Sequence, residues 1–108
     1  MSKQFSIYES IYKALDKYYD EHPEQAEELQ DYLSEANPHI WAGECSGDPA
    51  VYEDFLTFLS TLDYESLSTY QIAKLYFAQL DEYYSGAIRI VSSMSEEDFN
   101  TLLAKAQA

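Results

Sequence analysis

The apolar residues between positions 5 and 21 recur with the period of an α-helix, and this pattern constrains the fold more than any other feature. At about 100° per residue, most of them lie on one side of a helix. That side consists of Phe5, Tyr8, Ile11, Tyr12, Leu15, Tyr18 and Tyr19. The opposite side consists of Ser6, Glu9, Ser10, Lys13, Asp16, Lys17 and Asp20. This separation is typical of an amphipathic helix and not of a strand, so the segment predicts a long helix with one buried face.

Proline positions predict a second and a third helix. Pro23 suits the first turn of a helix, because its missing N–H would have no partner there. This second helix ends before Pro38, since the residue that precedes a proline disfavours helical geometry. Asp48 and Pro49 form an N-cap followed by proline at the first helical position. From them a third helix is predicted to run to about residue 62.

The segment from residue 68 to residue 92 reads as one long helix. Ser68 and Gln71 have the spacing of a capping box at its start. The apolar stripe keeps its helical phase through Gly86, so we expect the helix to continue to residue 92. A break at Ser85-Gly86 is the alternative, because a glycine inside a helix costs about 1 kcal/mol relative to alanine.

A short last helix and the scarcity of turn residues complete the predicted fold. Ser95 and Asp98 frame the start of that helix, which reaches the end of the chain. The 108 residues include only three glycines and three prolines, which leaves little material for turns between strands. We therefore predict an all-α fold: a single domain over residues 1–108, forming a four- or five-helix bundle with one longer loop at about 37–48.

The charge of the chain restricts its partners. Twenty acidic residues against six basic ones give a net charge of −14. Such a chain repels nucleic acid and anionic membrane surfaces, because binding to both relies on lysine and arginine. We expect no direct nucleic-acid binding and no membrane, and a protein with a basic surface as the partner. The alternative is that the acidity serves only solubility.

Cysteine usage and the absence of apolar runs predict a compartment. The single cysteine, Cys45, has no partner for an internal disulfide, which fits a reducing environment. Residues 1–6 are followed by no apolar signal core, and no stretch approaches the roughly 20 apolar residues of a membrane span. We therefore expect a cytoplasmic protein.

The loop at 37–48 holds residue types that carry chemistry in other proteins. These loop candidates are His39, Trp41, Glu44 and Cys45. Zinc sites need closely spaced pairs of ligands, which one cysteine cannot supply. Glu44 also disfavours the thiolate of Cys45, because a neighbouring anion raises the pKa of a thiol. We predict no catalytic, metal or cofactor site; in the purely structural interpretation, Ile40 and Trp41 plug the end of the core.

Tyrosine is the unusual residue type of this chain, with eleven copies. Most tyrosines lie on the apolar stripes, where they suit half-buried positions. Two adjacent pairs have acidic neighbours, and the second predicted helix has an acidic outer face. Tyrosine is enriched at the buried centres of protein interfaces, so these residues are the candidates for partner binding. They are Tyr18, Tyr19, Asp20, Glu24, Glu27, Glu28, Asp31, Asp81, Glu82, Tyr83 and Tyr84.

The second pair, within Asp81-Glu82-Tyr83-Tyr84-Ser85-Gly86, resembles the surface of nuclease-colicin immunity proteins. Those proteins are also small, acidic and helical, and use a tyrosine pair beside carboxylates to cover a basic nuclease surface. Their pair lies on a short helix, whereas this one lies inside a long predicted helix. The resemblance is therefore one of surface chemistry and not of family.

These observations leave several functions open. The leading hypothesis is a non-enzymatic binding protein, in its specific form an inhibitor or immunity-type protein that covers a basic surface. A second hypothesis is a DNA mimic, whose regularly spaced carboxylates on the second helix imitate phosphates. A third is a structural or accessory domain that self-associates through aromatic surface. An enzyme built on His39 and Cys45 is the weakest of the alternatives.

Overall fold

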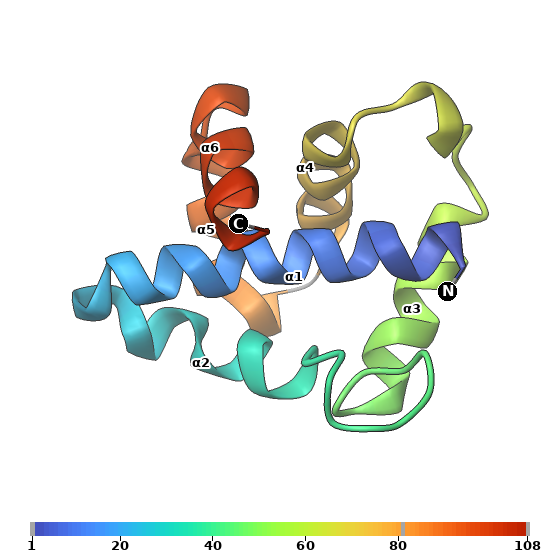
Figure 1. The fold of residues 1–108 in the computed structure, drawn as a ribbon, viewed down its shortest axis with the longest axis horizontal. Helices are drawn as coiled ribbons and strands as arrows, with labels where there is room; N and C mark the ends of the chain where they lie inside the picture. Colours follow the sequence, from blue (N-terminus) through green and yellow to red (C-terminus); the bar gives the residue numbers. More distant parts are fainter. Residues whose placement is uncertain (1, 81, 108) are drawn as a thin grey trace.

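The first helix, α1 (Lys3–Glu21), runs through the middle of the molecule, and the other helices pack around it (Figure 1). This computed structural model describes residues 2–80 and 82–107, without the side chains of Ala26 and Glu82. All regular secondary structure in these residues is helical, which confirms the predicted all-α fold class. None of the described helices combines the length and the apolar character that a membrane span requires.

Six α-helices and three short 3-10 helices follow one another along the described residues. After α1 come η1 (Pro23–Gln25), α2 (Ala26–Glu35), α3 (Pro49–Leu59), η2 (Tyr64–Ser66), α4 (Thr69–Gln79), η3 (Glu82–Tyr84), α5 (Ser85–Ser93) and α6 (Glu96–Ala106). The predicted caps are present: Asp48, Ser68 and Ser95 each accept a backbone N–H of the first turn. Ser68 and Gln71 form the full capping box, which confirms that local prediction.

The predicted single helix over 68–92 is wrong. α4 ends at Gln79, where Leu80 adopts an extended conformation, and α5 begins at Ser85, so the break precedes Gly86. The reason is tertiary: once the chain turns, α4 and α5 pack against each other and both bury their apolar faces in one core. The buried residues are Ile72, Ala73, Tyr76 and Phe77 on α4 and Ala87, Ile90 and Val91 on α5. A straight helix would carry one of these faces away from the core.

Gly86 allows α5 to approach α2 closely. A Cβ atom at this position would lie 2.2 Å from the backbone oxygen of Glu28. Real contacts of Cβ atoms are essentially never this short, so only glycine fits here without movement of the backbone. The residue that the sequence marked as a weak point of a helix is therefore a packing residue between two helices.

The tyrosines of α1 connect this helix to the end of α2. The hydroxyl of Tyr8 donates to the backbone oxygen of Ala36 at 2.5 Å, and that of Tyr12 donates to the backbone oxygen of Leu33 at 2.9 Å. The last carbonyls of a helix lack partners within the helix, so these hydroxyls satisfy groups that would otherwise be unpaired. Both rings are buried, as the stripe on α1 predicted.

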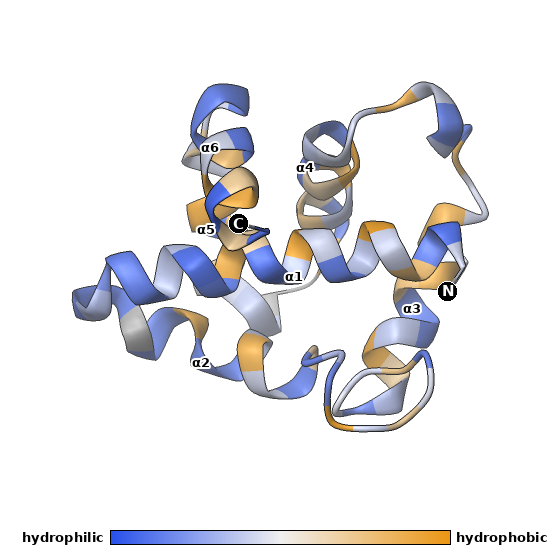
Figure 2. Ribbon diagram, viewed as in Figure 1, coloured by the Kyte–Doolittle hydropathy of each residue, from blue (hydrophilic) through white to orange (hydrophobic). Residues whose placement is uncertain are grey.

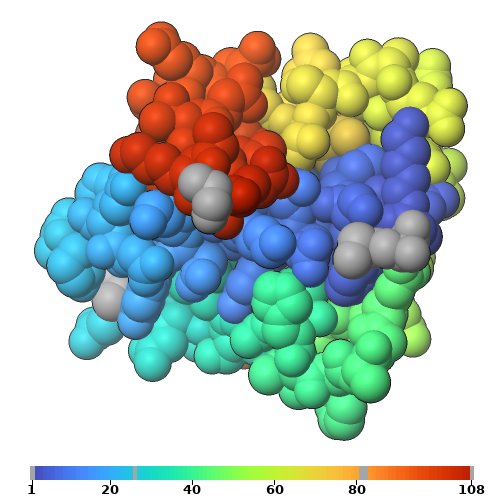
Figure 3. Space-filling model, viewed as in Figure 1, coloured from blue at the N-terminus to red at the C-terminus, as the bar shows by residue number. Residues whose placement is uncertain are grey.

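α6 closes the core on the other side of α1. The two helices lie against each other (Figure 3). The residues that α6 buries are Phe99 and Leu102. The ends of α1 and α6 that project from the middle of the molecule are hydrophilic, while apolar residues gather where the helices meet (Figure 2). Glu27, Glu28 and Asp31 of α2 are exposed, so the acidic face of this helix lies on the outside, as its sequence predicted.

Candidate functional site

Tyr83 and Tyr84 form an exposed pair in the short helix η3, and one carboxylate holds both. The hydroxyl of Tyr83 donates to Oε2 of Glu35 at 2.8 Å, and that of Tyr84 donates to Oε1 at 3.2 Å. The rings meet edge to face, with centroids 4.9 Å apart. The side chain of Tyr83 is 61% exposed, whereas Tyr84 is half-buried against Tyr32. The pair is thus presented in a set geometry at the surface.

Glu35 also contributes to the raised pKa of both phenols. Its hydrogen bond to Tyr83 and its charge both raise the pKa of that phenol. The pKa of Tyr84 is raised first by burial and then by the charge of Glu35. Both hydroxyls therefore stay protonated and act as donors well above neutral pH.

A groove of about 770 Å³ opens beside this pair, between the end of α2, the length of α3 and the end of α4. We call it the acidic groove. Its lining residues are Glu35, Asp48, Ala50, Val51, Asp54, Thr57, Phe58, Thr61, Tyr76, Gln79, Leu80, Tyr83 and Tyr84. They include three carboxylates and four aromatic rings, but no lysine, arginine or histidine.

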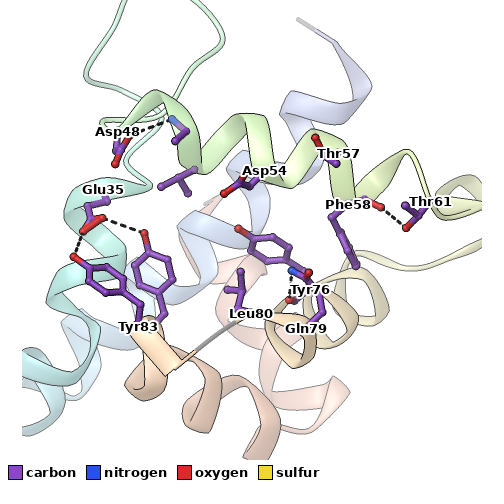
Figure 4. Close-up of a pocket in the computed structure, with 13 residues that line it drawn as sticks. Glu35, Asp48, Asp54, Thr57, Phe58, Thr61, Tyr76, Gln79, Leu80 and Tyr83 are labelled. Atoms are coloured by element: carbon purple, nitrogen blue, oxygen red, sulfur yellow. Dashed lines mark hydrogen bonds between the residues drawn. The ribbon is translucent and has the colours of Figure 1, made fainter.

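The three carboxylates reach the acidic groove from two helices. Asp48 caps α3, where its Oδ1 accepts the N–H of Ala50 at 3.1 Å. Asp54 points from α3 toward the groove above Tyr76, and Glu35 lies at the other end beside the tyrosine pair (Figure 4). Burial, and then the charge of Asp54, raise the pKa of Tyr76. The groove therefore joins fixed negative charge to an aromatic wall.

A second hollow, of about 380 Å³, lies on the other side of the pair, between α2 and α5. We call it the α2 hollow. Its lining residues are Glu27, Glu28, Asp31, Tyr32, Tyr83, Tyr84, Ser85, Gly86 and Arg89. Arg89 forms an ion pair with Glu28. The structure therefore brings three carboxylates of the acidic second helix together with the tyrosine pair.

Other predicted partner-binding residues do not join this surface. Glu24 is exposed on η1 and lines neither hollow. Asp81 lies outside the described residues, and Glu82 lies in η3 without a described side chain. Tyr18 stacks on His22, with ring centroids 4.0 Å apart, and donates to the side chain of Gln25.

The first tyrosine pair lies on another part of the molecule. Tyr18 borders a hollow formed with α5 and α6, separate from both hollows beside Tyr83. Tyr18 and Tyr19 are half-buried and pack against the core, while Asp20 is exposed. The two predicted pairs therefore do not form one continuous surface, and the hollow beside Tyr18 combines Glu21, Glu97 and Asp98 with Lys105.

The expectation that Ile40 and Trp41 plug the core is wrong. Their side chains are 56% and 54% exposed. The loop closes on itself instead, because the N–H of Gly47 donates to the backbone oxygen of Asn37 at 2.9 Å. Ser46 takes the buried position in this loop, and the indole N–H of Trp41 donates to its backbone oxygen at 2.9 Å. The tryptophan thus lies over its own loop.

The remaining loop candidates have separate partners on α1 and at its start. Nε2 of His39 lies 3.0 Å from a carboxylate oxygen of Glu9. Glu44 accepts the backbone N–H of Ser2 at 2.6 Å, and this hydrogen bond lowers the pKa of Glu44. Cys45 is a half-buried free thiol. In the described part of the chain, no three residues among His, Cys, Asp and Glu are grouped to hold a metal ion.

Apart from Tyr83 and Tyr84, the residues that line the acidic groove were not among the predicted partner-binding residues. The sequence marks Asp48 as a helix cap, and neither Asp54 nor Tyr76 is among the predicted site residues. They come together only because α2, α3 and α4 meet beside η3. Comparisons of the chain with models of protein families, with curated proteins and with solved structures found no match.

Proposed function

We propose that this chain is a non-enzymatic binding protein that covers a basic surface of another protein, and that it acts as an inhibitor or immunity-type protein. The observation that carries the proposal is the Tyr83-Tyr84 pair, held by Glu35 and flanked by two acidic hollows. Exposed tyrosine beside carboxylates suits the centre of an interface with a cationic partner. The lone cysteine and the acidic composition support a cytoplasmic location for it.

In the proposed mechanism, the carboxylates and the tyrosines have different roles. The carboxylates raise the rate of encounter with a basic surface, since long-range attraction steers association. The tyrosines then supply the buried contact that slows dissociation. Because Glu35 already holds both hydroxyls, binding costs little ordering of these side chains.

The setting of the pair supports the resemblance to nuclease-colicin immunity proteins. The sequence alone placed Tyr83 and Tyr84 inside a long helix. In the structure they lie on the short helix η3. One difference between the two surfaces is thereby removed, whereas the surrounding sequence pattern does not match that of those proteins. This support concerns the chemistry of the surface and not ancestry.

The DNA-mimic hypothesis has weaker support. A mimic needs a regular series of unpaired anions, and the carboxylate series of α2 is interrupted by the pairing of Glu28 with Arg89. A large exposed tyrosine in the middle of the acidic surface also has no counterpart in a phosphate backbone. Competition with DNA for the same partner would nevertheless favour the mimic over a general inhibitor.

The test starts from affinity capture with the full chain, followed by reconstitution with the purified partner. We expect the association rate to fall with increasing ionic strength, as it does for electrostatically steered complexes. Tyr83→Ala should weaken binding by about 30-fold, the effect of losing an interface anchor of about 2 kcal/mol. Glu24→Gln is the matched control for a surface change outside both hollows, and it should leave affinity within about twofold.

Two results would contradict the proposal. One is an association rate that does not depend on ionic strength, because the acidic surface would then have no part in the encounter. The other is a partner that binds the Tyr83→Ala variant as tightly as the original chain. Light scattering of the chain alone, at several concentrations, separates binding to a partner from self-association.

A further inference from the structure

The acidic groove contains no ion pair among its described residues, although Glu35 accepts hydrogen bonds from Tyr83 and Tyr84 and Asp48 caps α3. Five ion pairs are present among the described residues, and their carboxylates are Glu9, Glu21, Glu28 and Glu65. Glu35, Asp48 and Asp54 take part in none of them. The groove therefore holds three negative charges beside apolar and aromatic side chains, with no cation among its lining residues.

The shape and lining of the groove narrow the kind of cation that fits. Its volume of about 770 Å³ lies within the range of about 300–1,000 Å³ that is typical of clefts that enclose a ligand. Phe58 and Tyr84 are half-buried, so part of each ring is open to a ligand. Glu35 and Asp48 lie at the end of the groove near Tyr83, and Asp54 lies between them and Phe58 (Figure 4). A ligand here needs both a flat apolar face and several N–H donors.

Arginine meets both requirements and lysine only one. The guanidinium group is planar, stacks on aromatic rings and donates N–H groups to carboxylates in a forked geometry. It is also more weakly hydrated than an ammonium group, so it is transferred more readily into a half-enclosed groove. Lysine offers a point charge with a strongly held hydration shell.

We propose that the acidic groove receives an arginine side chain of the basic partner, with the guanidinium group directed at the carboxylate of Asp54, while Glu35 and Asp48 add negative charge toward the other end of the groove. This inference rests on the proposed function and deepens it, because it names the side chain that the surface selects. The aliphatic part of the arginine then lies along Phe58 and Leu80. The neighbouring tyrosine pair contacts the surface around the arginine.

The test uses the full chain and two small probes, Nα-acetyl-arginine amide and Nα-acetyl-lysine amide, in an NMR titration at low ionic strength. We expect saturable shifts that centre on backbone amides of α3, η3 and the end of α4. The arginine probe should bind about threefold more tightly than the lysine probe, because stacking adds to the charge interaction. Asp54→Asn should weaken arginine binding by about threefold or more.

Glu53→Gln is the matched control, since it removes the same charge from the neighbouring position of the same helix. Glu53 is exposed and does not line the groove, so this variant should change arginine binding by less than about twofold. The amide spectrum of each variant shows directly whether it keeps the fold. Shifts spread over the whole acidic surface, equal binding of both probes, or an Asp54→Asn variant that binds normally would overturn the inference.

The purified partner separates this inference from the proposed function. A basic partner that binds Asp54→Asn as tightly as the original chain, but not Tyr83→Ala, would overturn the arginine site and leave the proposed function standing. Arginine binding in the groove by a chain that associates with no basic protein would retain the arginine site and overturn the proposed function.

Discussion

The acidic groove and the α2 hollow lie on opposite sides of the same tyrosine pair, and each contains three carboxylates. Their cation content differs by one side chain: Arg89 pairs with Glu28 in the α2 hollow, whereas no lysine, arginine or histidine lines the acidic groove. Arg89 pairs with one carboxylate of the α2 hollow and leaves Glu27 and Asp31 without an ion pair in the described part of the chain, so the position of the few cations decides how much negative charge each region keeps. In a chain with six basic residues, each placement matters.

Alkaline pH should lower the free energy of unfolding, because buried tyrosines line both regions. We expect this effect on stability to be the largest. Tyr32 lines the α2 hollow and Tyr76 the acidic groove, and burial raises the pKa of both above their ordinary value near 10. Burial likewise raises the pKa of Tyr12 to about 12. Above pH 10 the unfolded chain loses phenolic protons that the folded chain keeps, so the free energy of unfolding falls as pH rises.

This stabilisation is complete below pH 10 and decreases above it. For Tyr12 alone it amounts to about 3 kcal/mol, which is lost between roughly pH 10 and pH 12. Urea unfolding at pH 8, 10 and 11, with tyrosinate absorbance as a second readout, measures the loss. A free energy of unfolding that is constant from pH 8 to pH 11 would show that these tyrosines titrate normally in the folded chain.

Gly86→Ala should disrupt the α2 hollow and leave the acidic groove as it is. On an isolated helix the change would favour folding by about 1 kcal/mol. Here the new methyl group meets the backbone of Glu28, so we expect a net loss of about 1–3 kcal/mol in the free energy of unfolding. Urea denaturation measures it. Gly43→Ala is the control, because nothing lies within 4 Å of its Cβ position; equal effects of the two changes would contradict the close approach.

The two tyrosines that separate the hollows should differ in their contribution to stability. Tyr84→Phe removes a half-buried hydrogen bond to Glu35 and should cost about 1 kcal/mol. Tyr83→Phe removes a hydrogen bond at an exposed side chain, and it should change stability by less than about 0.5 kcal/mol. Thermal and urea unfolding of the two variants provide the comparison. A larger effect at Tyr83 would mean that this residue, and not Tyr84, holds η3 in place.

Arg89→Gln should give the acidic groove and the α2 hollow the same charge. We expect it to change the free energy of unfolding least. An exposed ion pair contributes about 0–1 kcal/mol, so the stability should change within that range. The α2 hollow would then hold three unpaired carboxylates, and we expect the arginine probe to produce a second set of shifts on α2 and α5. Shifts that stay confined to the acidic groove would show that its aromatic lining, more than its charge, selects the probe.

Most helices of this protein can be predicted from short segments of its sequence. The apolar period of residues 5–21 and the caps at Asp48, Ser68 and Ser95 predicted four helix starts or faces that the structure contains. Caps and periods depend on residues three or four positions apart, so they can be read without knowledge of the fold. The acidic face of α2 was predicted for the same reason.

The candidate site could be predicted only in part. The sequence marked Tyr83, Tyr84 and the acidic face of α2, because an aromatic pair with acidic neighbours is visible in the linear chain. It did not mark Asp54 or the role of Glu35, since their partners lie on other elements; Glu35 is 48 residues from Tyr83. It also placed Trp41 in the core, whereas the closed loop keeps that side chain at the surface.

The sequence by itself determined the class of the fold, the acidic exterior and the inward direction of most tyrosines, because helical periodicity and charge act over short distances. The tertiary structure decided the break between α4 and α5, the approach of Gly86 to Glu28 and the separation of the two hollows. An apolar stripe in the sequence has the same spacing whether one long helix or two packed helices carry it. Only the need to bury both halves in one core distinguishes the two forms, and that need arises when the whole chain packs together.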